Sequence, residues 1–282
     1  MTKEKNIPDQ SQSQPGREHK MHPKPEIISE GYKGSNKLKD KIALITGGDS
    51  GIGRSVAVHF AREGAKVGIV YLEEDEDART TRELVEAEGS QCLIIKGDLQ
   101  DSEFCTKAVE KCVDEFGGLN ILVNNAAMQK AKDNLENIDD EQLQQTFETN
   151  VFHYFRTTRA PLKYLREDDC VINTSSVTAY RGSDHLMDYA STKGAIVGFT
   201  RSLAKNLAKK KIRVNGVAPG PIWTPLIPAT LDNVSEFGKD TPMGRPGQPS
   251  EVGPAYVFLA SQDSSYITGQ FIHINGGEIV GA

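Results

Sequence analysis

Residues 41–53 read Lys-Ile-Ala-Leu-Ile-Thr-Gly-Gly-Asp-Ser-Gly-Ile-Gly, an apolar run that leads into a glycine-rich turn. The run of residues 41–46 predicts a buried strand. Apolar residues at helical spacing predict a helix from Gly51 to Glu63. Glycines at 47, 51 and 53 allow a ligand to approach the backbone, and the helix N-terminus attracts anions. This unit therefore predicts a phosphate-binding turn, although an ordinary tight turn is an alternative.

The alternation of strand and helix patterns continues along the chain. We expect strands at 66–71, 91–96, 120–123, 170–174, 212–217 and 271–274, and helices at 74–88, 101–116, 141–165, 187–209 and 250–260. Such alternation implies right-handed crossovers and a parallel sheet. The predicted fold is α/β: one Rossmann-type doubly wound domain with a seven-stranded parallel sheet, order 3-2-1-4-5-6-7, and helices on both faces. Ligands of such sheets bind beyond the carboxyl ends of the strands.

The composition excludes several classes of function. The 282 residues include 33 Lys and Arg against 39 Asp and Glu, a net charge of -6, so we expect no nucleic-acid partner. No apolar run approaches the ~18 residues of a membrane helix, so we expect no membrane association. The chain starts without the apolar stretch of a secretory signal. Four cysteines without CxxC spacing favour reduced thiols over disulfides or a metal site. We therefore expect a cytoplasmic protein without a metal.

The first 40 residues differ from the rest in composition. They carry a charge near +2 and few apolar residues, whereas the remaining 242 residues carry a charge near -8. A segment of this kind is typical of a disordered tail. The alternative is an arm that lies along its own domain or a neighbouring subunit, anchored by Ile27, Ile28, Tyr32 and Leu38. We thus divide the chain into a polar tail or arm, 1–40, and a catalytic domain, 41–282.

Tyr189 and Lys193 are four residues apart in a predicted helix, so both side chains can reach one pocket. A free phenol has a pKa near ~10, and bringing it close to 7 needs about 4 kcal/mol. A nearby ammonium can supply that by favouring phenolate. Ser176 lies just past the strand of residues 170–174, where its hydroxyl could donate to a carbonyl oxygen that Tyr189 protonates. The adjacent Ser175 is an alternative, and the Tyr–Lys spacing alone occurs by chance in many helices.

Five motifs together resemble the short-chain dehydrogenase/reductase family in its single-domain form. They are T-G-G-D-S-G-I-G at 46–53, N-N-A-A at 124–127, Ser176, Y-A-S-T-K at 189–193 and P-G-P-I at 219–222. The resemblance runs from about Leu38 to Val280. Within the family, the chain is similar to bacterial members near the glucose dehydrogenase and general-stress aldehyde reductase groups.

The resemblance implies roles for four residues. Tyr189 is expected to be the general acid in carbonyl reduction and the base in alcohol oxidation. Lys193 would lower the pKa of Tyr189 and hold the nicotinamide ribose, and Ser176 would polarise the substrate oxygen. Asn150 resembles the asparagine that holds a water for the proton relay. A polar residue that caps or kinks a buried helix is the alternative for Asn150.

The resemblance also implies the cofactor contacts. The expected residues are Gly47, Asp49, Ser50, Gly51, Ile52, Gly53, Tyr71, Leu72, Asp98, Leu99, Asn124, Ala126, Tyr189, Lys193, Pro219, Gly220, Ile222 and Thr224. Asp98 could instead be a helix N-cap, and Asn124 could chiefly brace the sheet.

The choice between NAD and NADP depends on the end of the strand at 66–71. Tyr71 stands where NAD users of the family usually have an acid, but no Arg or Lys is placed to neutralise a 2′-phosphate. Arg54 lies in the preceding helix, residues 51–63, where it could be a surface charge. Glu73 and Glu74 are close by, and their repulsion of a phosphate favours NAD over NADP.

Residues 221–249 form a Pro-rich stretch that we interpret as a substrate lid. We expect an oxidoreductase that moves a hydride between nicotinamide and an aldehyde, ketone, sugar or alcohol. Nucleotide-sugar epimerisation or dehydration is one alternative, and a non-enzymatic nucleotide-binding subunit is another. The terminal strand and the long helices suit self-association, and the family implies a homotetramer.

Overall fold

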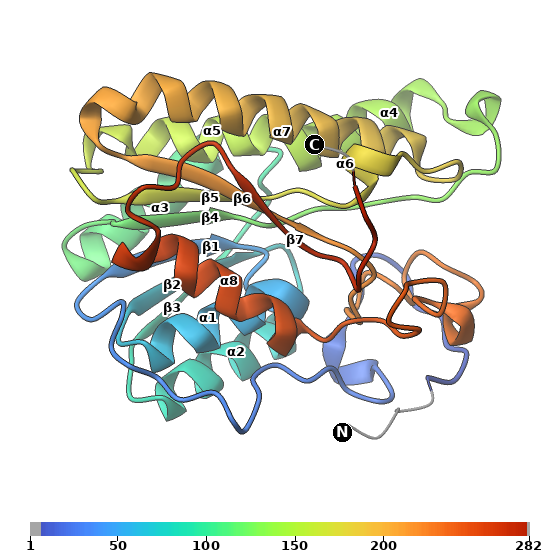
Figure 1. The fold of residues 1–282 in the computed structure, drawn as a ribbon, viewed down its shortest axis with the longest axis horizontal. Helices are drawn as coiled ribbons and strands as arrows, with labels where there is room; N and C mark the ends of the chain where they lie inside the picture. The colour runs from blue at the N-terminus through green and yellow to red at the C-terminus, as the bar shows by residue number, and fades with distance from the viewer. Residues whose placement is uncertain (1–6, 281–282) are drawn as a thin grey trace.

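A seven-stranded parallel sheet forms the centre of the computed structural model, which describes residues 7–280 (Figure 1). Its strands are β1 (Ile42–Thr46), β2 (Lys66–Tyr71), β3 (Cys92–Lys96), β4 (Ile121–Asn124), β5 (Cys170–Thr174), β6 (Arg213–Pro219) and β7 (Phe271–Ile274). The strand order is β3-β2-β1-β4-β5-β6-β7, and every neighbouring pair is parallel. This confirms the predicted fold and strand order. The order reverses between β1 and β4, which places a crevice beyond the carboxyl ends of these strands.

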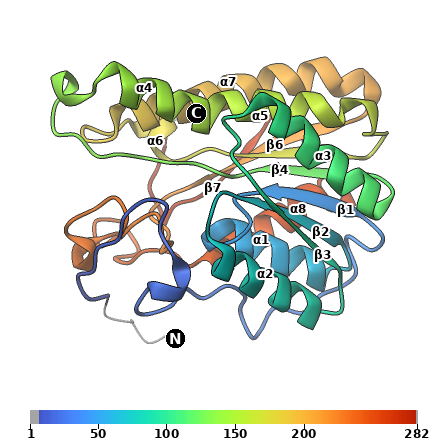
Figure 2. The ribbon, with the colours of Figure 1, turned by 180° about the vertical axis from the view of Figure 1, so that it is seen from behind.

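Helices cover both faces of the sheet, as Figures 1 and 2 show. One face carries α1 (Gly51–Arg62), α2 (Asp75–Ala87) and α8 (Pro249–Ala260); the other carries α3 (Ser102–Phe116), α4 (Asp140–Phe147), α5 (His153–Arg159) and α7 (Met187–Leu207). The buried apolar residues form two clusters that match these layers. One cluster unites α1, α2 and α8 with the sheet, and the other unites α3 and α7 with its opposite face.

The helix predicted over residues 141–165 is not one regular helix. It consists of α4, a π-helical turn (Glu148–Phe152), α5 and a 3-10 turn (Ala160–Lys163). Pro161 lacks the N–H that an α-helix would need there. The short helix α6 (Thr178–Arg181) was not predicted. The other short 3-10 turns are Glu18–Lys20, Leu135–Asn137, Ala208–Lys210, Val234–Glu236 and Gln262–Ser264.

The turn between β1 and α1 needs glycine at two of its positions. Gly47 has a φ of +62°, in the left-handed region that favours glycine. A Cβ on Gly53 would lie 1.9 Å from the main-chain oxygen of Gly47. The first turn of α1 therefore packs directly against the strand end, which leaves its N-terminus facing the crevice.

The described part of the N-terminal segment, residues 7–40, lies along the domain instead of extending away from it (Figure 1). Leu38 is fully buried, and Ile27 and Ile28 pack against the cluster of α1 and α8. The hydroxyl of Tyr32 donates to Glu63 Oε1 at 2.6 Å. All four proposed anchors thus contact the domain, as the arm alternative requires. Residues 1–6 and 281–282, the outer ends of the two predicted parts, lie outside the described residues.

The four cysteines are free thiols within the described chain. Burial raises the pKa of the Cys112 thiol to about 12, so this thiol is unreactive at neutral pH.

Among residues 7–280, no helix combines the length and apolar character needed to cross a bilayer.

Candidate active site

A cavity of about 920 Å³ opens beyond the carboxyl ends of the strands, next to the β1–α1 turn. The predicted site residues that line it are Gly47, Asp49, Ser50, Gly51, Ile52, Tyr71, Leu72, Asp98, Leu99, Ala126, Ser176, Tyr189, Lys193, Pro219, Gly220, Ile222 and Thr224. Gly53, Asn124 and Asn150 are not part of the lining. The sheet therefore gathers most of the residues that the motifs indicated around one space.

Helix α7 places Tyr189 and Lys193 one turn apart at this cavity. Both side chains are buried, with exposed fractions of 9% for Tyr189 and 1% for Lys193. Lys193 Nζ donates to the main-chain oxygen of Thr174, at the end of β5, over 3.1 Å. The same nitrogen lies 5.4 Å from the centre of the Tyr189 ring. The amine is thus held beside the phenol by the strand end.

Burial shifts the pKa values of these two groups in opposite directions. It raises the pKa of Tyr189 to about 12, against the lowering effect of a hydrogen bond with Ser176. It lowers the pKa of Lys193 to about 7. Tyr189 is therefore protonated at neutral pH and can act as a proton donor. Lys193 is balanced between its charged and neutral forms, so a nearby anion would favour the ammonium.

The two adjacent serines have different partners. Ser175 donates through Oγ to the main-chain oxygen of Lys193 at 2.9 Å, which ties α7 to β5. Ser176 Oγ accepts from the N–H and the hydroxyl of Thr178, at 3.2 and 3.1 Å. Because both of these bonds use Ser176 as the acceptor, its own hydrogen is free to point toward Tyr189 or a substrate oxygen. This geometry favours Ser176 over Ser175 as the polarising hydroxyl.

Asn150 lies in the π-helical turn between α4 and α5 and is fully buried. Its Oδ1 accepts from the Met128 N–H at 2.8 Å, and its Nδ2 donates to the Met128 oxygen at 2.8 Å. Nδ2 also donates to Thr192 Oγ1, at 3.1 Å, on the turn of α7 that carries Lys193. The side chain thus joins the loop after β4 to α7 from outside the cavity. This fits the alternative of a polar residue at an irregular point of a buried helix.

Asn124 braces the sheet, as its alternative interpretation expects, and it is not part of the cavity lining. Its side chain is buried, donates to Asn173 at 2.9 Å and Thr158 at 3.0 Å, and accepts from Thr157 at 2.7 Å. The neighbouring Asn125 lines the cavity instead. Sequence reasoning could not separate the two, because adjacent asparagines at a strand end look alike until the partners are known.

Gly53, expected among the cofactor contacts, also lies outside the cavity lining, at the point where α1 packs against Gly47. Asp98 behaves as expected of a cavity residue. Its Oδ1 accepts from the Gln100 N–H at 2.8 Å, and the N-cap of α3 is Asp101. The N-cap alternative for Asp98 is therefore excluded.

Two buried acidic residues lie near each other beyond the ends of β1 and β2. Asp49 and Glu74 are 7% and 5% exposed, and both line the cavity. Burial, followed by the charge of Glu74, raises the pKa of Asp49 to about 7. Glu74 Oε1 is buried and has no hydrogen-bond partner among the described residues. Such an atom is an acceptor in need of a donor, which a ligand hydroxyl could supply.

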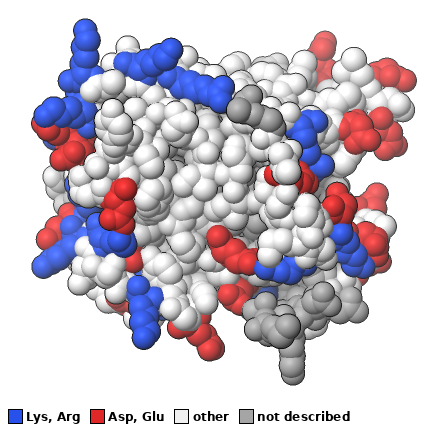
Figure 3. All heavy atoms as spheres, in the orientation of Figure 1, with Lys and Arg blue, Asp and Glu red and all other residues white. Residues whose placement is uncertain are grey.

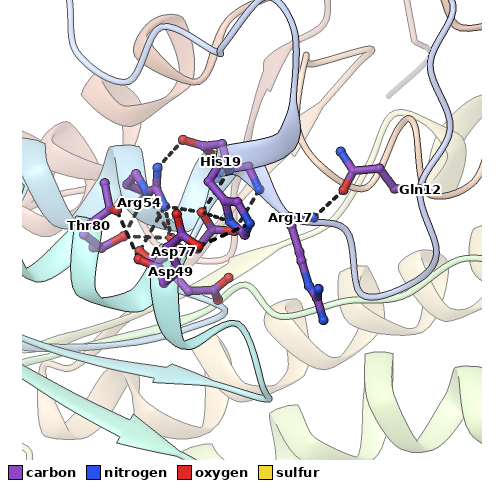
Figure 4. A network of polar contacts seen from close by, with 11 residues as sticks. Gln12, Arg17, His19, Asp49, Arg54, Asp77 and Thr80 are labelled. Carbon is purple, nitrogen blue, oxygen red and sulfur yellow. Dashed lines mark hydrogen bonds and ion pairs between the residues drawn. The ribbon is translucent and has the colours of Figure 1, made fainter.

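Arg54 is buried, so its interpretation as a surface charge is wrong. Its guanidinium donates to the Asp49 main-chain oxygen at 2.9 and 2.7 Å and forms ion pairs with Asp77, at 3.3 Å, and Glu18. Figure 4 shows Arg54 close to Asp49 and Asp77, with His19 of the N-terminal segment on the other side of Asp77. Sequence reasoning missed Glu18 and Asp77, because nothing in their spacing links them to the glycine turn.

The predicted lid, residues 221–249, covers one side of the cavity. Leu226, Ile227 and Phe237 line the space, and Trp223 is fully buried beneath it. Gln129, Arg181 and His185 also reach the lining, which gives the apolar lid a polar opposite wall.

Comparison with known proteins extends these observations. Residues 47–278 match the family model described as Enoyl-(Acyl carrier protein) reductase. The chain is 56% identical over 279 residues to general stress protein 39 of Bacillus subtilis, covering 98% of each chain. It is 51% identical over 281 residues to glucose and ribitol dehydrogenase of Daucus carota, covering 97% of each.

A solved structure has the same fold. It is a short-chain dehydrogenase from Burkholderia cenocepacia in complex with NADP, with a TM-score of 0.81 and 32% identity. The match covers 86% of this chain and 98% of that one. The protein therefore belongs to the short-chain dehydrogenase/reductase family of oxidoreductases.

Proposed function

We propose that the protein interconverts a carbonyl compound and its alcohol, with a bound nicotinamide dinucleotide supplying or accepting the hydride. The observation that carries this proposal is the arrangement of Ser176, Tyr189 and Lys193 around one cavity. A phenol that is protonated at neutral pH lies beside a hydroxyl with a free hydrogen and a buried amine. These are the groups that protonation of a carbonyl oxygen needs.

The residues present fit such a cofactor. The N-terminus of α1 faces the cavity, and a Cβ on Gly51 would lie 3.0 Å from the side chain of Thr224. Ile52, in the first turn of α1, would hold a phosphate with its backbone N–H group, whereas the Gly51 N–H already donates to Glu18. Glu74 Oε1, buried without a partner among the described residues, would accept from a ribose hydroxyl. Lys193 and Pro219 to Thr224 would hold the nicotinamide end.

The chain's own groups carry the proton. In reduction, Tyr189 transfers its hydroxyl proton to the carbonyl oxygen as that oxygen gains charge, and it becomes a phenolate. Ser176 donates a hydrogen bond to the same oxygen and stabilises the developing charge. Lys193, held at Thr174, stabilises the phenolate until a proton returns from solvent. In oxidation, Tyr189 acts as phenolate and takes the proton from the alcohol.

We propose NAD as the preferred cofactor. The support is electrostatic: Asp49 and Glu74 are buried acids of the cavity lining, and a 2′-phosphate bound near them would add negative charge beside theirs. Arg54 does not neutralise them, because Glu18 and Asp77 already pair with it. Glu74→Gln should improve kcat/KM for NADPH at least about tenfold relative to NADH. Glu83→Gln, at an exposed acid of α2 outside the cavity lining, provides the matched control. An unchanged ratio would contradict the assignment of Glu74 as the discriminating group.

The substrate class is tested with wild-type protein and a panel of aldehydes, ketones and sugars. The expected result is NADH oxidation with formation of one alcohol per NADH consumed. Substrate isomerisation without net NADH oxidation would indicate the epimerase class. NADH binding without turnover of any compound would favour a nucleotide-binding subunit.

We also propose a cytoplasmic homotetramer. Strand β7 ends the sheet, and its four residues are only half-buried in the single chain. Figure 3 shows a broad area without charged side chains on the face that carries β7 and α8. Phe155 on α5 is 50% exposed. These apolar surfaces suit association, which light scattering would test as a mass of four chains.

A further inference from the structure

The N-terminal arm, defined here as residues 7–26, lies beside the lid at the mouth of the cavity. Figures 1 and 2 both show the blue arm next to the orange lid segment. Five hydrogen bonds connect arm and lid. The three shortest run from Gln12 N–H to the Pro228 oxygen at 2.7 Å, from Ser235 N–H to Asp9 Oδ1 at 2.8 Å, and from Trp223 Nε1 to the Pro23 oxygen at 2.8 Å. Main-chain and side-chain groups of the lid thus have their partners on the arm.

The apolar packing of the lid also depends on the arm. Ile7 and Met21 form a buried cluster with the lid residues Trp223, Ile227 and Val234, separate from the two clusters on the sheet. Without the arm, the buried face of the lid would lose this cover. Contact between the two segments is close, because a Cβ on Gly16 would lie 2.1 Å from the Pro225 oxygen.

Glu18 fastens the arm to the glycine turn. Its carboxylate accepts from the Gly51 N–H at 2.6 Å and pairs with Arg54, and it is 3% exposed. The backbone N–H groups of Glu18 and His19 donate to the carboxylate of Asp77 at 2.8 and 3.0 Å. Figure 4 shows this junction, with His19 against Asp77 and Arg54. One charged residue of the arm therefore makes contact with the N-terminus of α1.

The arm also contributes to the cavity itself. Gln14, Pro15 and Gly16 line the cavity, two to four positions before Glu18. Gln14 Nε2 donates to the main-chain oxygen of Gln129 and lies 3.4 Å from Thr230 Oγ1. The arm thus bridges the loop after β4 and the lid while it is anchored at the dinucleotide turn.

We propose that the arm is part of the active site: Glu18 is a positioning residue that anchors it at the glycine turn, and the anchored arm holds the lid over the substrate end of the cavity. This rests on the proposed function, since it takes the cavity as the site of cofactor and substrate. Loss of the anchor frees arm and lid together, because they share one apolar cluster. Substrate affinity then falls, while Ser176, Tyr189 and Lys193 keep their places on β5 and α7.

The test compares full-length wild type with Glu18→Gln. Glutamine can still accept from the Gly51 N–H, but it leaves the buried Arg54 without this counter-charge. The matched control is Glu30→Gln, an exposed acid further along the N-terminal segment. The readouts are amide hydrogen exchange of residues 223–237 and NADH binding by fluorescence titration. Values of kcat and KM are measured separately for the reduction of a carbonyl compound.

In Glu18→Gln we expect exchange in residues 223–237 to accelerate at least about tenfold and KM for the carbonyl compound to rise by a similar factor. The strands should keep their protection, and kcat should stay within about twofold of wild type. Glu30→Gln should match wild type in every readout. If Glu18→Gln does not fold, Trp223→Phe decides, because it keeps an aromatic side chain in the arm–lid cluster, removes the hydrogen bond to Pro23 and reduces the packing between arm and lid.

Unchanged lid exchange in both Glu18→Gln and Trp223→Phe would overturn the proposal. So would tighter NADH binding with unchanged lid exchange, which would mean that Glu18 merely opposes the phosphates. A uniform loss of protection over all strands, with kcat reduced, would also overturn it by indicating a global structural role. Hydrogen exchange needs no substrate, so a lid response without carbonyl turnover would refute the proposed function and leave the role of the arm intact.

Discussion

Lys193→Met is expected to abolish activity and at the same time stabilise the protein. Lys193 is 1% exposed, and burial lowers its pKa from 10.5 to about 7. The folded protein therefore holds the Lys193 amine in a buried environment that disfavours its charged form. Methionine has a similar length and no charge, so it can occupy the same space at a lower cost.

The magnitude follows from the pKa change at about 1.4 kcal/mol per pKa unit. At pH 7 the unfolded chain binds a full proton at this lysine and the folded chain about half, which costs about 4 kcal/mol of folding free energy. The variant also loses the hydrogen bond to the Thr174 oxygen, worth about 1 kcal/mol. We therefore expect Lys193→Met to raise the free energy of unfolding by about 3 kcal/mol at pH 7.

The sign of the pH dependence is specific to this explanation. Between the folded pKa of about 7 and the unfolded value of 10.5, the unfolded chain binds more protons, so stability increases with pH. The advantage of Lys193→Met should shrink by about 2 kcal/mol between pH 7 and about pH 9. Urea unfolding of both proteins at the two pH values measures this difference, and Lys209→Met, an exposed lysine, is the control. If Lys193→Met is less stable than wild type at both pH values, or if its gain in unfolding free energy is the same at both, burial of the Lys193 amine does not cause the difference.

Three further outcomes follow from the site. Ser176→Ala should lower kcat by about 10²- to 10³-fold while NADH binding is retained, and stopped-flow rates with a fluorescence titration check this; an unchanged kcat would point to Ser175. Asn150→Ala should cost about 2–3 kcal/mol of unfolding free energy, because it leaves the Met128 backbone groups unpartnered; a loss of activity at full stability would instead favour a direct part in proton transfer. Since burial raises the pKa of Tyr189 to about 12, alcohol oxidation should accelerate with rising pH and carbonyl reduction should not; opposite trends in steady-state rates would show that Tyr189 is not the titrating group.

The fold could be predicted because its signals are local. The apolar run of residues 41–46 and the glycines after it depend only on neighbouring residues, and each later strand and helix repeats such a pattern. The pair of Tyr189 and Lys193 was also predictable, since residues four apart in a helix share a side. The structure differs from the prediction where a contact between distant residues decides the conformation. Residues 141–165 contain a π-helical turn at Asn150, whose side chain bonds to the backbone of Met128, 22 residues earlier.

The features that the sequence could not reveal are polar contacts between distant segments. Arg54 has the appearance of a surface charge, and only the fold brings it to Glu18 and Asp77. Asn124 and Asn125 cannot be distinguished from the sequence, because they are adjacent residues of the same type. In the structure, Asn124 donates to Asn173 and Thr158 and lies outside the cavity lining. The composition of residues 1–40 favoured a disordered tail. Contacts such as that of Glu18 with Arg54 depend on single residues, so the composition of the segment does not reveal them.

In the proposed reaction, Tyr189 supplies the proton for carbonyl reduction. The most direct measurement is single-turnover NADH oxidation, with an accepted carbonyl compound, by wild type, Tyr189→Phe and the control Tyr180→Phe, whose hydroxyl lies outside the cavity lining. We predict that Tyr189→Phe binds NADH as wild type does but reacts at least about 10²-fold more slowly, while Tyr180→Phe stays close to wild type. Equal rates for Tyr189→Phe and wild type, with NADH bound to both, would show that Tyr189 does not supply the proton.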